Sequence, residues 1–144
     1  MIVRQAKCDL KVLVADDQSA CREDVRTILE PLGLAIEEAE SGEEALDLLN
    51  VHPVHILVCD MYLPRLTGLE TVKLARRVHA QLPCILISGQ VDPPLIRRAM
   101  EAQVYSVLAK PISRHELIYT LNRALVKTYG PALSPDQAQS PPEE

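Results

Sequence analysis

Short apolar runs recur along the chain, and each is followed by a polar turn and a segment in which apolar residues fall at helical spacing. Runs rich in Val, Ile and Leu without polar alternation predict strands that are covered on both faces. The second run passes into Glu37 and Glu38, which predicts a partly exposed edge strand. The five runs span residues 10–15, 34–39, 54–59, 84–87 and 104–109.

Five helices are predicted between and after these runs. The first contains apolar residues from Cys21 to Leu32 and ends at Gly33, a residue typical of helix C-termini. Asp92-Pro93-Pro94 opens the fourth helix, because proline is tolerated in a first turn. The other three starts carry a hydroxyl residue followed three positions later by Glu, the pattern of a capping box. These pairs are Ser41 with Glu44, Thr67 with Glu70, and Ser113 with Glu116.

Regular alternation of strands and helices predicts the fold class. We expect an α/β, flavodoxin-like, doubly wound fold, in which a five-stranded parallel sheet of order 2-1-3-4-5 has helices on both faces. One domain should span residues 10–129, preceded by an N-terminal extension at 1–9. Residues 130–144 are rich in Pro, Ser, Gln, Asp and Glu, which predicts a disordered tail or a linker.

Polar residues follow four of the five predicted strands. They are Asp16-Asp17, Asp60, Ser88 and Lys110. Each has an ordinary explanation when taken alone, such as a helix cap, a turn residue or a solvated lysine. Because parallel strands end at the same rim of a sheet, where such folds bind ligands, we expect these side chains to converge.

Three clustered carboxylates repel one another and favour a bound cation. Oxygen ligands suit a hard metal ion, and Mg²⁺ fits better than Ca²⁺, which needs more protein ligands than the sequence supplies. Lys110 would add a fixed positive charge and Ser88 a hydroxyl donor. Together these groups suit phosphoryl transfer, in which a carboxylate can itself be the nucleophile and form an acyl phosphate.

Composition narrows the class of protein. The net charge of −5 argues against direct nucleic-acid binding by this domain. No apolar run approaches the length of a membrane span, and the short run after Lys11 does not suit a signal peptide. The four cysteines form no CxxC pair, so buried thiols in a cytoplasmic protein are expected. With no Phe or Trp, the core must be aliphatic.

The order and spacing of Asp16-Asp17, Asp60 with Leu63-Pro64 and Gly68, Ser88-Gly89, and Lys110-Pro111 resemble the CheY-like receiver domain of bacterial two-component response regulators. The resemblance covers roughly residues 10–126. It implies a phosphoacceptor that takes a phosphoryl group from the phosphohistidine of a sensor histidine kinase or a histidine phosphotransfer protein. It also implies an output effector, which could be a C-terminal domain absent from this chain, and a possible phosphorylation-dependent dimer.

The same resemblance assigns roles to individual residues. Asp60 would be the phosphoacceptor, and Asp17, Asp60 and the backbone carbonyl of Tyr62 would bind Mg²⁺, with Asp16 acting through a water. Lys110 would pair with the phosphoryl group, and Ser88 would swing toward it. The bond from Lys110 to Pro111 is often cis in the family. The only catalysis implied is that of the domain's own phosphorylation and dephosphorylation.

Val107 departs from the family pattern. Receiver domains often have Tyr or Phe three residues before the lysine, where the ring changes position with the hydroxyl residue, and here that position lacks a ring. Tyr105 lies two residues earlier and is expected on the same strand face. We therefore expect the coupling between Ser88 and the last two helices to be altered or weaker.

Three other functions remain open at this stage. An aspartate-nucleophile phosphatase of the haloacid dehalogenase type would want a second Asp two residues after the first, where this chain has Tyr62. An FMN-binding module would want a Ser/Thr/Gly-rich loop after the first strand, where Asp16-Asp17-Gln18 stands. A receiver-like interaction scaffold that takes no phosphate is disfavoured by the full set of acidic, hydroxyl and lysine groups, and slightly favoured by Val107.

Overall fold

The apolar runs form one parallel sheet in the computed structural model, which describes residues 10–130. Within these residues the strand order is β2-β1-β3-β4-β5, as predicted, and all neighbours pair in parallel. The predicted N-terminal extension at 1–9 lies outside the described residues, as do residues 131–144 of the tail predicted at 130–144. The strands are β1 (Lys11–Ala15), β2 (Ala35–Ala39), β3 (Ile56–Asp60), β4 (Cys84–Ser88) and β5 (Ser106–Ala109).

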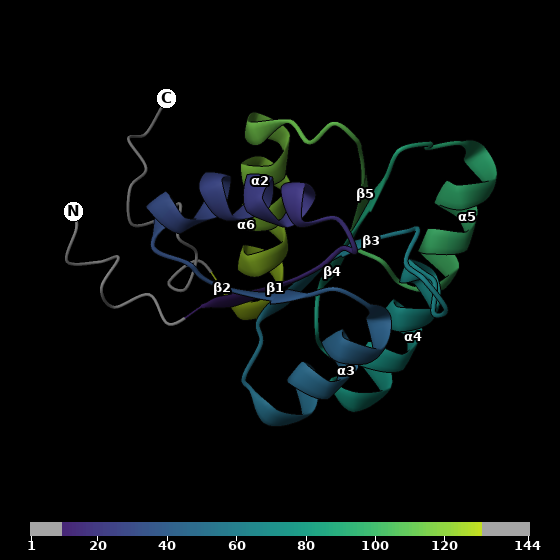
Figure 1. Cartoon of the computed structure of the whole chain (residues 1–144), viewed down its shortest axis with the longest axis horizontal. Coiled ribbons are helices and arrows are strands. Elements are labelled where there is room, and N and C mark those ends of the chain that lie inside the picture. Colours follow the sequence, from purple (N-terminus) through teal and green to yellow (C-terminus); the bar gives the residue numbers. More distant parts are fainter. Residues whose placement is uncertain (1–9, 131–144) are drawn as a thin grey trace.

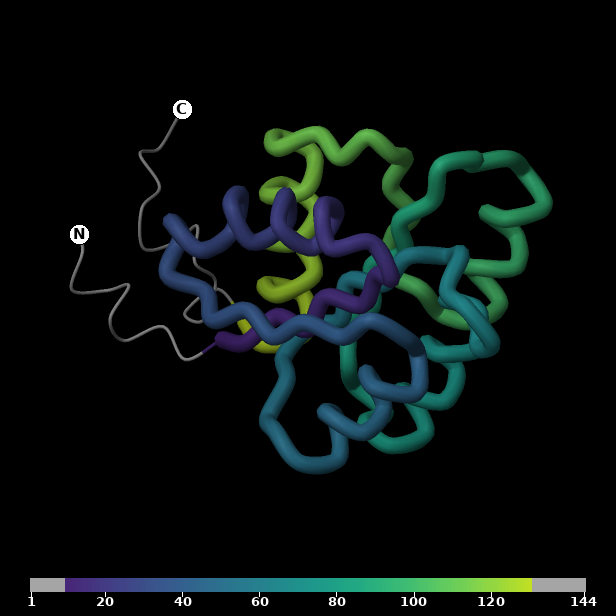
Figure 2. The backbone as a smooth tube through the Cα atoms, viewed as in Figure 1, coloured from purple at the N-terminus to yellow at the C-terminus, as the bar shows by residue number. Residues whose placement is uncertain are grey.

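Two layers of helices enclose this sheet. Figure 1 shows α2 and α6 on one face and α3, α4 and α5 on the other, and the tube in Figure 2 follows each crossover from strand to helix to the next strand. Among the described residues, no helix has both the length and the apolar character needed to cross a bilayer. The helices are α2 (Ser19–Leu29), the 3₁₀ helix η1 (Glu30–Leu32), α3 (Gly42–Val51), α4 (Gly68–Val78), α5 (Pro93–Glu101) and α6 (Arg114–Tyr129).

The predicted helix starts are present as side-chain caps. Thr67 and Glu70 form a complete capping box at α4. Ser41, Ser113 and Asp92 each accept a hydrogen bond from the backbone N–H three residues later. These caps satisfy amides that would otherwise lack partners, so the helix boundaries follow from local chemistry.

The first predicted helix is wrong at its end. The α-helix stops at Leu29 rather than Leu32, and the last three residues form η1. Pro31 explains the change, because proline has no N–H to donate to the carbonyl four residues earlier. Gly33 still ends the segment, with a φ of 90° that glycine adopts without strain.

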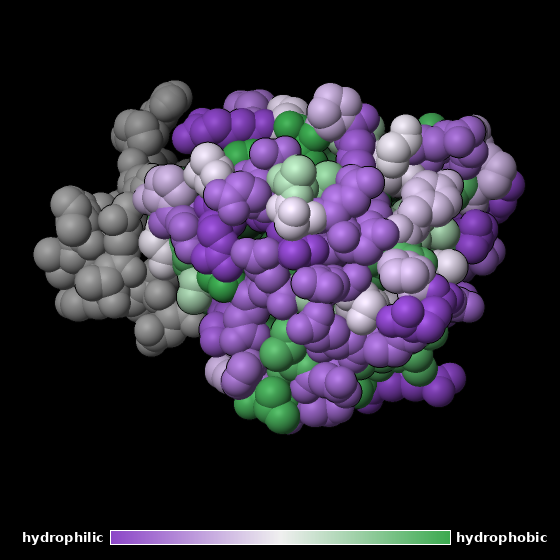
Figure 3. Space-filling view, in the orientation of Figure 1, coloured by the Kyte–Doolittle hydropathy of each residue, from purple (hydrophilic) through white to green (hydrophobic). Residues whose placement is uncertain are grey.

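The core is aliphatic and divided by the sheet. One cluster packs the strands against α3, α4 and α5, and the other packs them against α2 and α6. Cys59 and Cys84 are buried free thiols, as expected, and Cys21 is also free, whereas Cys8 lies outside the described residues. The space-filling view in Figure 3 is mostly hydrophilic, with small apolar patches over α3.

All five strands differ from their predicted spans by at least one residue at one end, and β3 and β5 each begin two residues later than predicted. β3 includes Asp60, because the ladder with β4 continues through Asp60 to Ile87, and His55 precedes the strand. β5 begins at Ser106, so the alternation of a strand does not extend to Tyr105. Tyr105 packs with the α2 and α6 cluster and Val107 with the opposite cluster, so the expectation that they share a face is wrong.

Gly68 lets α4 begin directly against the end of β3. Its N–H donates to the carbonyl of Met61 at 2.8 Å. A Cβ at this position would lie 2.3 Å from the backbone oxygen of Asp60 and 2.8 Å from the Cα of Met61. Both neighbours are backbone atoms, which cannot move aside cheaply, so only glycine fits beside the strand end that carries Asp60.

We expect Gly68→Ala to lower the free energy of unfolding by about 1–3 kcal/mol, because the added methyl group must displace backbone. Urea unfolding followed by circular dichroism measures the change. Gly89→Ala is the matched control, since a Cβ there meets nothing within 4 Å, and it should change stability by less than about 0.5 kcal/mol. Equal stability of wild type and Gly68→Ala would contradict the steric argument.

Candidate functional site

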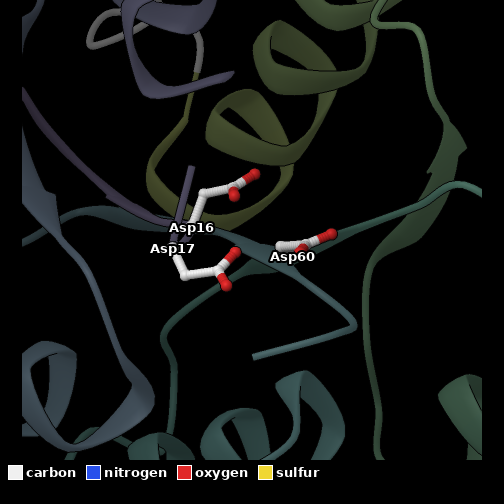
Figure 4. Close-up of side chains that lie close together, drawn as sticks. All are labelled: Asp16, Asp17 and Asp60. Carbon is white, nitrogen blue, oxygen red and sulfur yellow. The ribbon is translucent and has the colours of Figure 1, made fainter. Parts of the chain in front are cut away.

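The carboxyl ends of β1, β3, β4 and β5 meet at one rim of the sheet. Asp16 and Asp17 follow β1, Asp60 is the last residue of β3, and Lys110 follows β5. One carboxylate oxygen from each aspartate lies within 4.8 Å of the others. In Figure 4 the three carboxyl groups come from neighbouring points of the sheet and extend toward the same side. The structure therefore brings together the acidic residues that the sequence placed at separate strand ends.

Lys110 lies between two of these carboxylates. Its Nζ is 3.1 Å from Oδ2 of Asp16 and 3.2 Å from Oδ1 of Asp60, and its side chain is only 20% exposed. Its backbone N–H donates to the carbonyl of Ser88 at 2.8 Å, which fixes the start of the loop. Burial lowers the pKa of Lys110, but the hydrogen bonds and charges of Asp16 and Asp60 outweigh it and hold that pKa well above the ordinary lysine value.

Asp60 is 5% exposed and sits in an unfavourable electrostatic environment. Burial raises its pKa, the charge of Asp16 raises it further, and the hydrogen bond and charge of Lys110 only partly offset these effects. The folded protein therefore holds a carboxylate whose negative charge is incompletely compensated.

Asp16 is fixed through all of its polar groups. Its N–H donates to Ala39, its carbonyl accepts from Arg22 at 2.6 Å, and Oδ1 accepts from the N–H of Gln18 at 2.9 Å. The other oxygen, Oδ2, accepts from Lys110. Asp17, by contrast, is exposed at the mouth of the site. The arrangement gives one rigid buried carboxylate and one accessible carboxylate on consecutive residues.

Arg22 was missed by the sequence analysis. In the sequence it is simply a charged residue near the start of a predicted helix. Its hydrogen-bond partners belong to other segments of the chain. A charged residue at that point of an amphipathic helix is normally solvated, yet Arg22 is buried to 8% exposure. A buried guanidinium needs several acceptors, and the loop after β1 and the edge strand β2 provide them.

Ser88, Tyr62 and Pro111 lie at or just after the ends of β4, β3 and β5. The Ser88 side chain is fully buried, and its hydroxyl donates to the carbonyl of Gln90 and accepts from the Gln90 N–H. Tyr62 follows Asp60 by two residues and is 59% exposed. The Lys110–Pro111 peptide bond is cis. Val107, the position without a ring, packs with the cluster beneath α3, α4 and α5.

The donor set suits a hard divalent cation. Three carboxylates against one ammonium leave two formal negative charges in the cluster, and all of the candidate ligands are oxygens. A cation between Asp16, Asp17 and Asp60 would relieve the repulsion that raises the pKa of Asp60.

Comparison with known proteins identifies the family of this chain. The family model described as the response regulator receiver domain matches residues 12–122. The response regulator MprA of Mycobacterium sp. (strain KMS) is 32% identical over 127 residues, covering 88% of this chain and 55% of the relative. MprA of Mycobacterium avium (strain 104) is 32% identical over 119 residues, covering 83% of this chain and 52% of the relative. The chain thus spans about half the length of these curated relatives.

Solved structures show the same fold. The signal receiver domain of an HD domain-containing protein from Pseudomonas fluorescens Pf-5 superposes with a TM-score of 0.80 at 26% identity, over 84% of this chain and 98% of that chain. Chemotaxis protein CheY4 of Vibrio cholerae gives a TM-score of 0.77 at 28% identity, over 81% and 99%. Since the family model matches most of the chain and its relatives share both fold and sequence, the protein belongs to the response regulator receiver domain family.

Proposed function

We propose that this domain is a phosphorylation-controlled switch in which Asp60 takes a phosphoryl group in a Mg²⁺-dependent reaction. The observation that carries the proposal is the convergence of Asp16, Asp17 and Asp60 around the ammonium of Lys110, at the rim of a receiver fold. The proposed donor is the phosphohistidine of a sensor histidine kinase or a histidine phosphotransfer protein. The output would pass to an effector, either attached or separate.

Each residue has a physical role in this proposal. Asp16, Asp17 and Asp60 would hold Mg²⁺, with the backbone carbonyl of Tyr62 as a further ligand and Asp16 acting through a water. The cation supplies positive charge that offsets the charge on the phosphoryl oxygens. An oxygen of Asp60 forms the new bond to phosphorus as the bond from phosphorus to the donor imidazole breaks, and the imidazole takes up a proton from water.

Lys110 and Ser88 would respond to the phosphoryl group. Lys110 can exchange its contact with the carboxylate of Asp60 for one with a phosphoryl oxygen, which carries more charge. Ser88 would have to leave its two hydrogen bonds with the Gln90 backbone to donate to the phosphoryl group. That exchange would move the loop after β4 and couple the chemistry to α5, which follows it.

Incubation with acetyl phosphate and Mg²⁺ tests the chemistry directly. Intact mass spectrometry should show a single phosphoryl adduct on the wild type, and no adduct should form when EDTA is present from the start of the incubation. Asp60→Asn should abolish the adduct, since the amide oxygen is a poor nucleophile. The matched control is Asp24→Asn, an exposed carboxylate on α2, which should be modified like the wild type. A wild type that gains no adduct would instead support the scaffold function.

Neutralising Asp60 should change the pH dependence of stability. The folded-state pKa of Asp60 lies above its ordinary value, so the folded state binds the proton more tightly than the unfolded state does. The wild type therefore loses stability relative to Asp60→Asn as pH rises from the ordinary aspartate pKa, about 3.9, through the raised value. Urea unfolding in EDTA between pH 3.5 and about 7 measures this difference.

In EDTA at neutral pH the Asn variant should be the more stable protein, and the difference should shrink toward the acid end of the range. Mg²⁺ should stabilise the wild type more than the variant, because the cation binds the folded state through Asp60. A variant less stable than the wild type at neutral pH would contradict the charge argument.

Val107 should limit the response of α5. Hydrogen exchange of α5 amides, measured with and without beryllofluoride and Mg²⁺, should change less in the wild type than in Val107→Tyr. The reason is that valine has no ring to move into space vacated near Ser88, and Tyr105 lies on the other face of the sheet. Equal responses of the two proteins would show that this position does not control the coupling.

A further inference from the structure

Arg22 links the loop that carries the acidic pair to the edge of the sheet. From the second turn of α2, its Nη1 donates to the carbonyl of Asp16 at 2.6 Å. Its Nε donates to Oε1 of Glu38 on β2 at 2.7 Å, and Nη2 is 3.9 Å from Glu40. One guanidinium therefore bonds both the peptide between Asp16 and Asp17 and the neighbouring edge strand.

Glu38 holds this guanidinium in place. Its second oxygen, Oε2, accepts from Nε of Arg26 at 2.9 Å, one turn further along α2. The hydrogen bonds from Arg22 and Arg26 hold the pKa of Glu38 below its ordinary value, although burial opposes them. Arg22 and Arg26 thus share one carboxylate, and both are ordered against β2.

The bond from Arg22 acts on the orientation of a single peptide plane. The carbonyl of Asp16 and the N–H of Asp17 belong to the same planar unit, so a fixed carbonyl direction restricts the backbone from which the Asp17 side chain departs. Asp17 is exposed and has less packing to hold it than Asp16 has. The direction of the Asp17 carboxylate toward the cluster then depends on this peptide.

We propose that Arg22, oriented by Glu38, is a positioning residue that aims the Asp16–Asp17 carboxylate pair at the cation. The inference rests on the proposed function, since it concerns the Mg²⁺ site at that cluster. The fork of the guanidinium matters, because it reaches the Asp16 carbonyl and Glu38 at once, which a lysine ammonium cannot do with the same geometry.

The positioning role and a simple charge effect predict opposite signs. Arg22 is a cation next to a proposed cation site, so on charge alone its removal should tighten Mg²⁺ binding. If it positions the carboxylates, its removal should weaken binding, as loss of groups that orient metal ligands does, by about 10-fold or more.

Isothermal titration of each purified protein with Mg²⁺ tests the inference without reference to phosphorylation. Arg22→Gln should weaken Mg²⁺ binding about 10-fold, and Arg22→Lys, which keeps the charge and one bond, should recover part of the loss. The matched control is Arg26→Gln. This substitution removes the hydrogen bond from Arg26 to Glu38 and the ion pair of Arg26 with Glu30. Because neither of these contacts involves Asp16, the Mg²⁺ affinity should stay near the wild-type value.

Urea unfolding of each variant separates stability from binding, and Glu38→Gln is a second probe if Arg22→Gln fails to fold. Glu38→Gln should also weaken Mg²⁺ binding, because the remaining guanidinium loses the carboxylate that orients it. If the wild type binds Mg²⁺ and the Mg²⁺ affinity of Arg22→Gln is within twofold of the wild-type value, or tighter, the positioning role is overturned. The proposed function is then left intact. A wild type that binds no Mg²⁺ would overturn both.

Discussion

Three carboxylates, two of them buried, repel one another at the rim of the sheet, and the contacts around them must hold them together against that repulsion. Asp16, Asp17 and Asp60 lie close enough to share a cation, and Lys110 offsets only part of their charge. A folded chain can tolerate this arrangement only if the surrounding backbone holds the groups in place. The carboxylates therefore repel one another in the folded protein, and a bound divalent cation would reduce that repulsion.

Besides the contacts that the Asp16 and Asp60 carboxylates make with Gln18 and Lys110, several contacts hold the backbone around the site. Gly68 allows α4 to start against the carbonyl of Asp60, and the N–H of Lys110 bonds the carbonyl of Ser88. Arg22 bonds the carbonyl of Asp16, and Glu38 orients that guanidinium from the edge strand. Each loop that carries a charged group is therefore attached to a neighbouring element, which keeps mutually repelling side chains within a few ångströms of one another.

In the proposed switch, the path from the site to the surface would begin at Ser88. Its hydroxyl bonds the Gln90 backbone, so any movement toward a phosphoryl group must reorganise the loop that leads to α5. Val107 packs with the core cluster under α3, α4 and α5, and Tyr105 packs with the cluster on the opposite face, under α2 and α6. The receiver fold is thus combined with a valine at the position where the resemblance led us to expect an aromatic ring.

The order of strands and helices could be predicted from the sequence, because aliphatic runs, caps and glycine or proline breaks act locally and each segment carries its own signal. The sequence also placed Asp16, Asp17, Asp60, Ser88 and Lys110 at strand ends, which parallel pairing must bring to one rim. Three features could not be predicted from the sequence in this way. They are the end of α2, the face of the sheet on which Tyr105 packs, and the contacts of Arg22. The contact between Arg22 and Glu38 became visible in the folded chain, because hydrogen bonds between separate elements depend on how those elements pack and leave no periodic signal along the sequence.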